Sequence, residues 1–371
     1  MRLMSLDRVT PGMRLARPIH GPDGQKWLAR GVELTSGYID RLMARGIMMI
    51  YVEDDATCDV DSRDVISDEI RARAINVTRE ILDKAASAKF SSRRHVIHSE
   101  VYDIVGAIID ELRSRMRTIV SIISLKSYDN YTYEHSVNCA VLGMILGIGL
   151  DYSDAKLRNL GIGLLMHDIG KMRISKDILN KAGALDPWEF QQVKAHPELG
   201  FEILSEDDEV CAVSRAICLQ HHERCDGSGY PRRLTLESIQ EFSRVAAVVD
   251  VYDALTSDRI YRRAYLPSEA LQFLKKEAGK TFDARLVQML FSYIPPYPIG
   301  TLVSLSTGDT AVVVDINGDN LERPVVRILH DAPSGKPHHE GPEGRSGRCA
   351  GVIEIDLSRH RDITILHGLR S

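Results

Sequence analysis

Two adjacent histidines before an acidic, glycine-rich turn are the residues whose types and spacing point first to chemistry. They open the stretch HHERCDGSGYP, residues 221–231. The chain has 13 histidines, and those between residues 100 and 294 are His135, His167, His196, His221 and His222. Each is expected at a helix end or beside another polar side chain. Neutral imidazole is a common metal ligand, so a metal site is one hypothesis for this set.

Two aspartates extend the set. Asp168 directly follows His167 in LLMHDIGK, and Asp250 lies in the apolar helical pattern RVAAVVDVYDALTS. A carboxylate in such a helix is costly to bury unless it is paired or bound to metal. Imidazole with carboxylate and without thiolate suits iron, manganese or zinc. These ligands are too many for one ordinary site, so two metals bridged by one carboxylate fit. The alternative is that each histidine is a hydrogen-bonded core residue.

The expected elements place these side chains at helix ends. A helix capped at Ser153 is expected to end at Gly170, which leaves the HD pair at its C-terminal turn. His196 precedes a proline, so it is expected at a helix break. A third helix, VCAVSRAICLQHHE, is expected to stop at residues 226–227, just past the histidine pair. Helix bundles build metal sites from side chains that project inward from several helices.

The chain divides into four segments. Residues 1–58 mix short strand-like runs (MRLARPI, KWLARG and IMMIYVE) with one helix after Ser36, which predicts a small α/β module. Residues 64–124 show two long helical patterns that lead into a helical block over 125–294. After the breaker PPYPIG, the runs TLVSLS, TAVVVDI, PVVRILH, GVIEIDL and DITILH predict a small β-rich module over 295–371. The expected fold is therefore multidomain, with a central all-α bundle.

The second of the 64–124 helices carries an apolar stripe at three- and four-residue steps. Its members are Val101, Ile104, Val105, Ile108, Leu112, Met116, Ile119 and Ile123. Such a stripe is usually core, and a homodimer seam through these helices is the alternative. The loop at 331–348 is rich in glycine and proline, and its His338 and His339 are interpreted as part of a solvated loop rather than as metal ligands.

The composition limits the class of protein. With 44% hydrophobic and 27% charged residues over 371 positions, a soluble chain of several domains is expected. The cysteines include no CxxC pair and the N-terminus has no apolar signal region, so a cytoplasmic protein is expected. The longest apolar stretch has 14 residues, too few for a membrane span. The net charge of −5 argues against DNA as a partner, so an anionic ligand would need local cations.

The chain resembles the HD-GYP proteins, a branch of the HD-domain metal-dependent phosphohydrolases, through motifs that follow the family's order. These are His135-Ser136, HDIGK (167–171), HPELG (196–200), HHERCDGSGYP (221–231) and DVYDALTSDRIYR (250–262). The similarity covers roughly residues 125–290. It implies an HD-type helical bundle, a bacterial source, and hydrolysis of the second messenger cyclic di-GMP. The N-terminal module resembles, more weakly, the DUF3391 type.

The resemblance also implies a ligand set for two divalent metal ions, iron or manganese. One ion would be held by His135, His167, Asp168 and Asp250, and the other by Asp168, His196, His221 and His222, with Asp168 bridging. Cyclic di-GMP would then be cleaved by attack of metal-activated hydroxide on phosphorus.

The resemblance also implies that three basic side chains bind the substrate. Lys171 would act with Asp168 in catalysis by binding a phosphoryl oxygen, and Arg259 and Arg262 would grip the substrate phosphates. From the sequence alone, Lys171 is equally a solvated lysine near a helix end, and the two arginines are equally charges at the rim of the site.

Two features near the motifs have open interpretations. Asp253 is three residues after Asp250, where it either orients a metal ligand or is a helix-surface acid. In the DGSGYP loop both glycines permit positive φ, and proline stiffens the exit. The triplet Gly229, Tyr230 and Pro231 is expected to shape the substrate pocket or a partner surface.

The chain departs from the family at one position. Some HD-GYP proteins place a metal-binding glutamate four residues before the first motif histidine, where this chain has Tyr131. Glu134 is out of register on a helix, so two metals are expected rather than three. The linear product pGpG is then expected to be substantial, with GMP beyond it. Two other hypotheses stay open: a cyclic di-GMP receptor or scaffold that signals to partner proteins, and an HD phosphohydrolase for another nucleotide.

Overall fold

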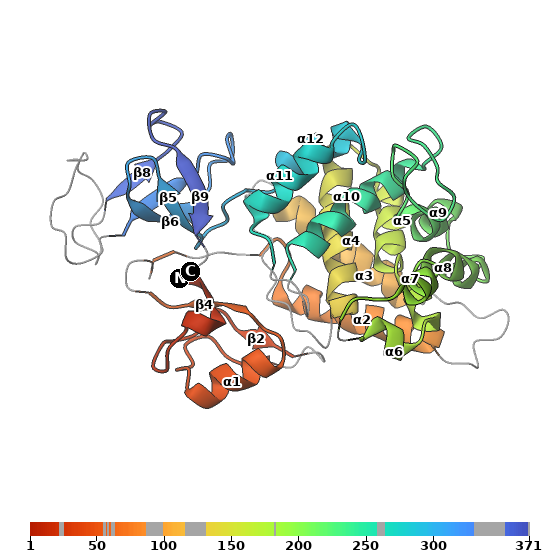
Figure 1. Ribbon diagram of the computed structural model, residues 1–371, viewed down its shortest axis with the longest axis horizontal. Helices are drawn as coiled ribbons and strands as arrows, with labels where there is room; N and C mark the ends of the chain where they lie inside the picture. The colour runs from red at the N-terminus through yellow and green to blue at the C-terminus, as the bar shows by residue number, and fades with distance from the viewer. Residues whose placement is uncertain are drawn as a thin grey trace.

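Three units make up the protein: a helical bundle and two smaller modules that lie on the same side of it (Figure 1). The computed structural model describes residues 1–21, 26–54, 57, 59–60, 64–86, 99–115, 131–181, 183–257, 264–329 and 353–369. This arrangement confirms the multidomain fold class, with a central all-α bundle, an N-terminal α/β module and a C-terminal β-rich module. Within the described residues, no helix is long and apolar enough to span a bilayer.

The N-terminal module contains two short antiparallel pairs and one helix. Strand β1 (Arg2–Ser5) pairs with β4 (Met49–Val52), and β2 (Ile19–His20) pairs with β3 (Lys26–Leu28). The 3-10 helix η1 spans Leu6–Arg8, and α1 spans Ser36–Ala44. The Thr35 hydroxyl caps α1 by accepting a hydrogen bond from the Tyr38 N–H. Strand β1 lies outside the expected strands, and most of the run MRLARPI is not regular strand.

The bundle is built from helices of very different length. They are α2 (Asp68–Ala86), α3 (Ser99–Arg115), α4 (Tyr131–Gly149), α5 (Asp154–Leu165), α6 (Lys176–Leu179), α7 (Pro187–Val193), α8 (His196–Ser205), α9 (Ala212–Gln220), α10 (Glu241–Leu255), α11 (Pro267–Glu277) and α12 (Ala284–Phe291). Helix α4 packs against α5, α10 and α2. It therefore stands at the centre of the bundle and carries the first motif histidine.

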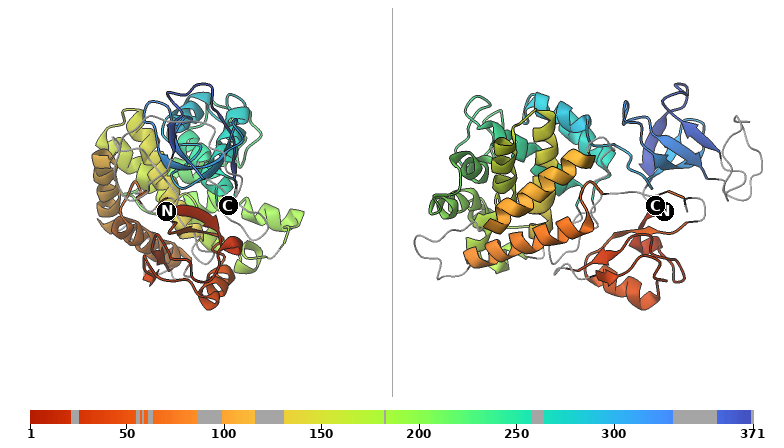
Figure 2. Two further views of the ribbon diagram at one scale, coloured as in Figure 1. Left: turned by 90° about the vertical axis from the view of Figure 1, so that its left-hand side faces the viewer. Right: turned by 180° about the vertical axis from the view of Figure 1, so that it is seen from behind.

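Helices α2 and α3 share one hydrophobic core with α4, α5, α8, α9 and α10, the helices that carry or precede the motif histidines and aspartates. They lie side by side along one face of the bundle, which is clearest from behind (Figure 2). The stripe residues of α3 are fully buried against this core, as its periodicity predicted; they are Val101, Ile104, Val105, Ile108 and Leu112. Met116, Ile119 and Ile123 lie outside the described residues. The described part of the stripe is therefore core within the chain.

The C-terminal module is an antiparallel sheet formed by the β-rich runs of the sequence. They are β5 (Leu302–Leu305), β6 (Thr310–Asp315), β7 (Val325–Ile328), β8 (Glu354–Asp356) and β9 (Ile365–Leu369). Their order is β8-β7-β6-β5-β9, so the last strand crosses to pair with the first strand of the module. The loop with His338 and His339 lies outside the described residues.

The N-terminal and C-terminal modules are docked to each other. The Leu3 N–H donates to the Gly300 carbonyl over 3.1 Å. Arg327, on β7, donates to both carboxylate oxygens of Asp59 over 2.7 Å and also pairs with Glu354. The Arg327 side chain is only 5% exposed. Because a buried guanidinium that loses its partners is strongly destabilising, this bidentate contact ties the two modules together.

Candidate metal centre

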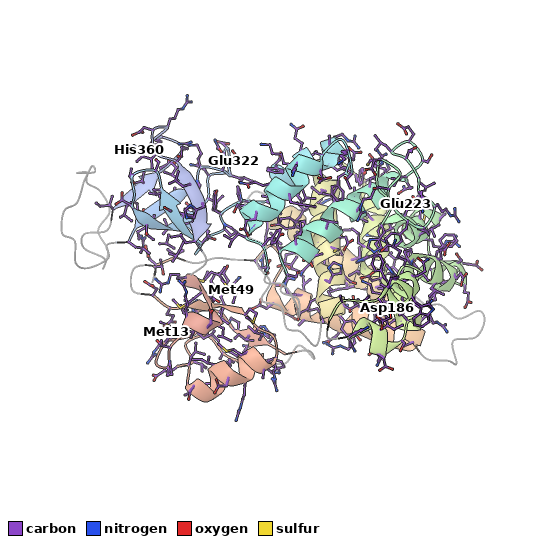
Figure 3. All side chains as sticks on the ribbon, viewed as in Figure 1. Met13, Met49, Asp186, Glu223, Glu322 and His360 are labelled. Carbon is purple, nitrogen blue, oxygen red and sulfur yellow. The ribbon has the colours of Figure 1, made fainter. Side chains whose placement is uncertain are left out.

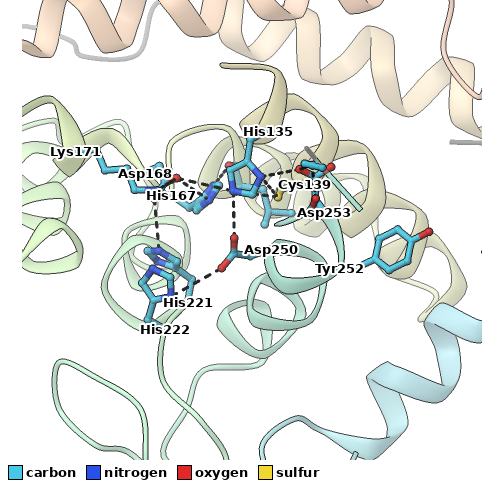
Figure 4. Close-up of polar contacts among 12 residues, drawn as sticks. His135, Cys139, His167, Asp168, Lys171, His221, His222, Asp250, Tyr252 and Asp253 are labelled. Atoms are coloured by element: carbon cyan, nitrogen blue, oxygen red, sulfur yellow. Dashed lines mark hydrogen bonds and ion pairs between the residues drawn. The ribbon is translucent and has the colours of Figure 1, made fainter. Parts of the chain in front are cut away.

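Side chains from five parts of the bundle converge on one point (Figure 4). His135 lies on α4 and Asp250 on α10, whereas His167 and Asp168 follow the end of α5. The first residue of α8 is His196, and the pair His221 and His222 directly follows α9. The structure thus brings together all seven side chains that the sequence selected as metal ligands.

Asp168 lies between two groups of imidazoles. Its Oδ2 atom is 3.9 Å from Nε2 of His135 and 3.5 Å from Nε2 of His167. Its Oδ1 atom is 3.3 Å from Nε2 of His196 and 3.8 Å from Nε2 of His221. Each carboxylate oxygen therefore faces a different pair of histidines, which is the arrangement that a bridging carboxylate needs.

Asp250 closes the other side of the cluster. Its Oδ1 atom is 3.1 Å from Nε2 of His135, and its Oδ2 atom is 3.8 Å from Nδ1 of His222. Candidate ligand atoms within 4.8 Å of one another form three groups. One holds His135, Cys139, His167 and Asp250, and another holds His196, His221 and His222. The third group, His167, Asp168 and His221, shares a residue with each of the other two. The two carboxylates thus connect the histidines of the first two groups.

Backbone carbonyls fix the tautomers of three histidines. Nδ1 of His167 donates to the Leu164 carbonyl over 2.6 Å, and Nδ1 of His196 donates to the Val193 carbonyl over 2.7 Å. His221 makes the same bond to the Cys218 carbonyl over 2.9 Å. A carbonyl oxygen only accepts, so each Nδ1 carries the proton and each neutral ring presents a bare Nε2 to the centre.

The bare nitrogens need a cation between them. Nε2 of His196 and Nε2 of His221 are 3.1 Å apart, although both carry lone pairs in these tautomers. Nε2 of His167 and Oδ1 of Asp168 are buried without a hydrogen-bond partner among the described residues. Buried polar atoms without partners are costly. Divalent metal ions satisfy such atoms, so the donor set fits a metal centre.

Burial keeps the imidazoles neutral. It lowers the pKa of His167, brings the pKa of His196 to about 4, and holds the pKa of both His221 and His222 well below the usual range. The lone pairs are therefore available at pH 7, because protonation of any of these rings would place an unsolvated positive charge in the core.

The carboxylates stay ionised for the opposite reason. Burial alone would raise the pKa of Asp168, but the positive charge of the Lys171 ammonium beside it acts in the opposite direction, and this pKa lies well below the usual range. At Asp250 the effect of burial is likewise outweighed, here by the hydrogen bond with His135, so its pKa also lies well below the usual range. Anionic carboxylates beside neutral imidazoles suit a divalent cation.

Asp253 orients the first motif histidine. Its Oδ2 atom accepts a hydrogen bond from Nδ1 of His135 over 2.8 Å, which turns Nε2 of the same ring toward Asp250. Asp253 is 3% exposed, so it is not a surface acid. A carboxylate behind a ligating histidine raises the basicity of the ring and fixes its orientation.

Two glycines bring the ligand-bearing backbones close together. A methyl group at Gly170 would lie 1.9 Å from the His196 carbonyl oxygen, and one at Gly200 would lie 3.0 Å from the Gly170 nitrogen. The prediction that Gly170 ends a helix was wrong. Helix α5 already ends at Leu165, without a side-chain hydrogen bond from Ser153, and Gly170 lies inside the 3-10 helix η4 (Ile169–Arg173). Its missing side chain lets η4 approach α8.

The loop after the histidine pair is held by Glu223, which the sequence reasoning missed. The carboxylate of this residue accepts hydrogen bonds from the Arg232 N–H over 2.7 Å and the Leu234 N–H over 2.9 Å. It is 1% exposed, and it lies on the side of the bundle away from the two modules (Figure 3). An acid directly after the histidine pair was the available signal. Helix α9 itself ends at Gln220, earlier than expected.

The two glycines of the DGSGYP loop have different roles. Gly227 has a φ of +78°, as expected, whereas Gly229 does not adopt positive φ. Instead a side chain at Gly229 would clash with the backbone of Glu223 and Arg224 at 2.4–2.6 Å. This close packing lets the Tyr230 ring stack on His222 with 4.8 Å between the ring centroids.

Cys139 is a second residue beside the centre that the sequence reasoning missed. It lies one turn after His135 on α4, and its Sγ atom is 3.7 Å from Nδ1 of that ring. Burial raises the pKa of the Cys139 thiol to about 12, so the sulfur is protonated at pH 7. The i,i+4 spacing from a motif histidine was the signal that could have found it.

The structure describes some of the remaining expected site residues and not others. Lys171 lies beside the centre, with its ammonium 2.5 Å from Oδ2 of Asp168. Arg259 and Arg262 lie outside the described residues. Tyr131 is the first residue of α4, and the buried Glu134 belongs to none of the candidate ligand groups among the described residues.

Known proteins resemble this chain over most of its length. A family model for the HD domain matches residues 119–286. A cyclic di-GMP phosphodiesterase of Pseudomonas aeruginosa is 34% identical over 313 residues, which cover 81% of this chain and 74% of the relative. The cyclic di-GMP phosphodiesterase PdeB of Borreliella burgdorferi is 32% identical over 203 residues, 54% of this chain and 52% of the relative.

A solved structure shares the fold. The structure of an HDG"Y"P protein from Bdellovibrio bacteriovorus aligns with a TM-score of 0.50 and 17% identity, over 78% of this chain and 97% of the other. The DUF3391 resemblance of the N-terminal module stays a prediction. Three observations point to the same family: the matched HD domain, the extent of the similarity to the Pseudomonas enzyme and the convergence of the motif residues. This chain belongs to the HD-GYP family of HD-domain phosphohydrolases.

Proposed function

We propose that the protein is a bacterial, cytoplasmic phosphodiesterase that hydrolyses cyclic di-GMP with two divalent metal ions, iron or manganese. The observation that carries this proposal is the pair of unprotonated Nε2 atoms of His196 and His221, 3.1 Å apart beside an ionised Asp168. A divalent cation between these two nitrogens would satisfy both lone pairs. The relatives named as cyclic di-GMP phosphodiesterases support the substrate.

The distances support a division of the ligands between two ions. Because Oδ2 of Asp168 faces one pair of histidines and Oδ1 faces another, this carboxylate suits a bridging role. The first ion would be held by His135, His167, Asp168 and Asp250, and the second by Asp168, His196, His221 and His222. Two ions held in this way would lower the pKa of water and neutralise the charge that develops on a phosphodiester.

The chain's own cations would complete the binding of the scissile phosphate. The Lys171 ammonium lies beside Asp168 and its side chain remains 25% exposed, so it can reach a phosphoryl oxygen presented to the centre. Arg259 and Arg262 follow α10 in sequence, and their role in gripping the substrate phosphates stays a prediction.

Asp253 would preserve the geometry of the site between turnovers. The bond from Nδ1 of His135 to this carboxylate leaves Nε2 unprotonated when a metal is bound, so the ring acts as a ligand and not as an acid. Gly229, Tyr230 and Pro231 would shape one wall of the pocket. The family position four residues before His135 is Tyr131, which supports two ions and pGpG as a substantial product, with GMP beyond it.

The test is turnover of cyclic di-GMP by the purified full chain loaded with Mn²⁺ or Fe²⁺, followed by chromatography of cyclic di-GMP, pGpG and GMP. Asp168→Asn keeps the shape but removes the bridging charge, so it should abolish hydrolysis and reduce the metal content. A matched control is Asp177→Asn, which changes an acid of the short helix α6 outside the cluster. Binding of cyclic di-GMP without any hydrolysis would refute the enzyme and favour the receptor.

A competition assay would reveal whether another nucleotide is the substrate. An excess of a nucleoside polyphosphate should leave cyclic di-GMP hydrolysis unchanged if cyclic di-GMP is the substrate. Strong competition together with faster turnover of the polyphosphate would contradict the assignment. A homodimer through the 64–124 helices and signalling partners of the flanking modules stay predictions.

A further inference from the structure

The metal centre opens toward His222. The side chains at the back of the cluster, which are His135, His167, Asp168, His196 and His221, are between 0% and 3% exposed. His222 is 18% exposed and Asp250 is 12% exposed. A substrate therefore approaches past His222, and the residues that surround this ring meet the parts of the substrate that extend beyond the reacting phosphate.

An aromatic ring and a lysine continue outward from His222. Tyr230 stacks on the His222 ring at an interplanar angle of 27°. The Lys194 ammonium lies 5.1 Å from the centre of the Tyr230 ring and 4.8 Å from the centre of the Phe190 ring. Phe190 is 49% exposed. We call Phe190, Lys194 and Tyr230 the aromatic–lysine strip; it leads from the metal centre to the surface at the end of α7.

Among the described residues, no carboxylate pairs with the ammonium of the strip. Glu189, the neighbouring acid on α7, is occupied by Lys181, whose ammonium donates to both of its oxygens over 2.8 and 2.6 Å. Within the part of the chain that the structure describes, no carboxylate forms an ion pair with Lys194. Lys171 differs, because Asp168 already neutralises it. Two aromatic faces thus hold Lys194 in place by cation–π contacts and leave its charge uncompensated.

We propose that this strip is the subsite for the half of the cyclic dinucleotide that the metals do not hold. A cyclic dinucleotide carries two phosphates and two bases, and a metal pair holds only the phosphate that is cleaved. Lys194 binds the second phosphate by a charge-assisted hydrogen bond, and the exposed Phe190 ring offers a face on which a base stacks. This inference rests on the proposed function and adds to it the residues that distinguish a cyclic dinucleotide from a simple phosphodiester.

Replacement of the lysine tests the inference. Lys194→Met keeps the length of the side chain and removes its charge, whereas Lys194→Arg keeps the charge. Loss of a hydrogen bond between charged groups should raise KM for cyclic di-GMP about 10- to 100-fold and change kcat little. Hydrolysis of bis(4-nitrophenyl) phosphate, which has one phosphate and no nucleobase, should not change. The arginine variant should recover most of the lost affinity.

Lys156→Met is the matched control. Lys156 also holds its ammonium over an aromatic ring, at 5.2 Å from the centre of Tyr152. It lies near the start of α5, about 15 Å along the helix from the HD pair at a rise of about 1.5 Å per residue. Its replacement removes the same charge and the same kind of contact, and KM for cyclic di-GMP should stay at the wild-type value.

Two outcomes overturn the inference directly. The first is an unchanged KM for cyclic di-GMP in Lys194→Met. The second is an equal loss of activity toward both substrates with a loss of bound metal, which would mean that Lys194 only supports the centre. If the wild type cleaves the simple diester but not cyclic di-GMP, the proposed function fails, and calorimetry with cyclic di-GMP then tests the strip separately. Weaker binding by Lys194→Met supports the strip, and equal or absent binding refutes it.

Discussion

Gly170→Ala tests whether close backbone packing sets the geometry of the metal centre. The added methyl carbon would lie 1.9 Å from the His196 carbonyl oxygen and 2.5 Å from the Gly200 nitrogen. Ordinary van der Waals contact begins at 3.4 Å, so η4 and α8 must separate by about 1.5 Å. Both neighbours are backbone atoms, and neither can turn away as a flexible side chain could.

This separation of η4 from α8 is larger than the variation that metal–ligand distances tolerate. Asp168 lies on one side of the contact and His196 on the other, and metal–ligand distances vary by only about 0.2 Å. Overpacking of a core costs about 1–3 kcal/mol, which corresponds to a fall of about 2–4 °C in Tm per kcal/mol for a domain of this size. A misplacement of about 1 Å at a reacting centre costs about 100-fold in rate. Turnover should therefore fall far more than stability.

The assay combines metal analysis, thermal unfolding and turnover of bis(4-nitrophenyl) phosphate. Gly106→Ala is the control, because a methyl group there meets nothing within 4 Å and Gly106 lies within α3. This change should stabilise the protein by up to about 1 kcal/mol and leave turnover unchanged. A Gly170→Ala protein with wild-type metal content and wild-type turnover would refute the argument that this approach positions His196 against Asp168.

Three further changes should have measurable effects. Glu223→Ala leaves two backbone N–H groups of the loop without their acceptor, so urea unfolding should show a fall of about 2–5 kcal/mol in the free energy of unfolding. An unchanged urea midpoint would contradict the stabilising role of these two hydrogen bonds. In metal-free protein, burial lowers the pKa of His196 from 6.5 to about 4. The unfolded chain therefore takes up a proton while the folded ring stays neutral, so His196 alone should lower stability by up to about 3 kcal/mol as pH falls from 6.5 to 4, and the other buried histidines should add to this fall. A flat profile in urea titrations would refute neutral buried rings. Arg327→Met leaves Asp59 unpaired between the modules, so limited proteolysis should cut the chain between the N-terminal module and the bundle faster than in the wild type, and equal rates would show that the contact is not needed.

The sequence predicted the convergence of the ligands because their motifs follow a family order and lie at helix ends. It predicted the C-terminal strands because valine, isoleucine and leucine gather in short runs separated by turn residues. Strand β1 was missed because RLMS is short and mixed in character, and its partner β4 lies more than forty residues away. Pairing over such a distance is a property of the tertiary structure.

Other features depended on packing that no local pattern records. Whether Asp253 is a surface acid or an orienting residue is decided by how α10 packs against α4. The role of Gly170 was misassigned because a glycine after a helix commonly ends it, whereas here the glycine makes room for α8. Lys194 was not selected, since only the folded chain shows that its neighbouring acid is already engaged by Lys181.

The partners of the histidine Nδ1 atoms differ in how far they depend on other side chains. His167, His196 and His221 donate to peptide carbonyls, and a substitution cannot delete a peptide group. The orientation of these three rings therefore does not depend on the side chain of any partner residue. His135 depends instead on the Asp253 carboxylate, which a single codon change removes. A change at position 253 would therefore leave the buried Nδ1–H of His135 without this acceptor, whereas the other three rings would keep theirs.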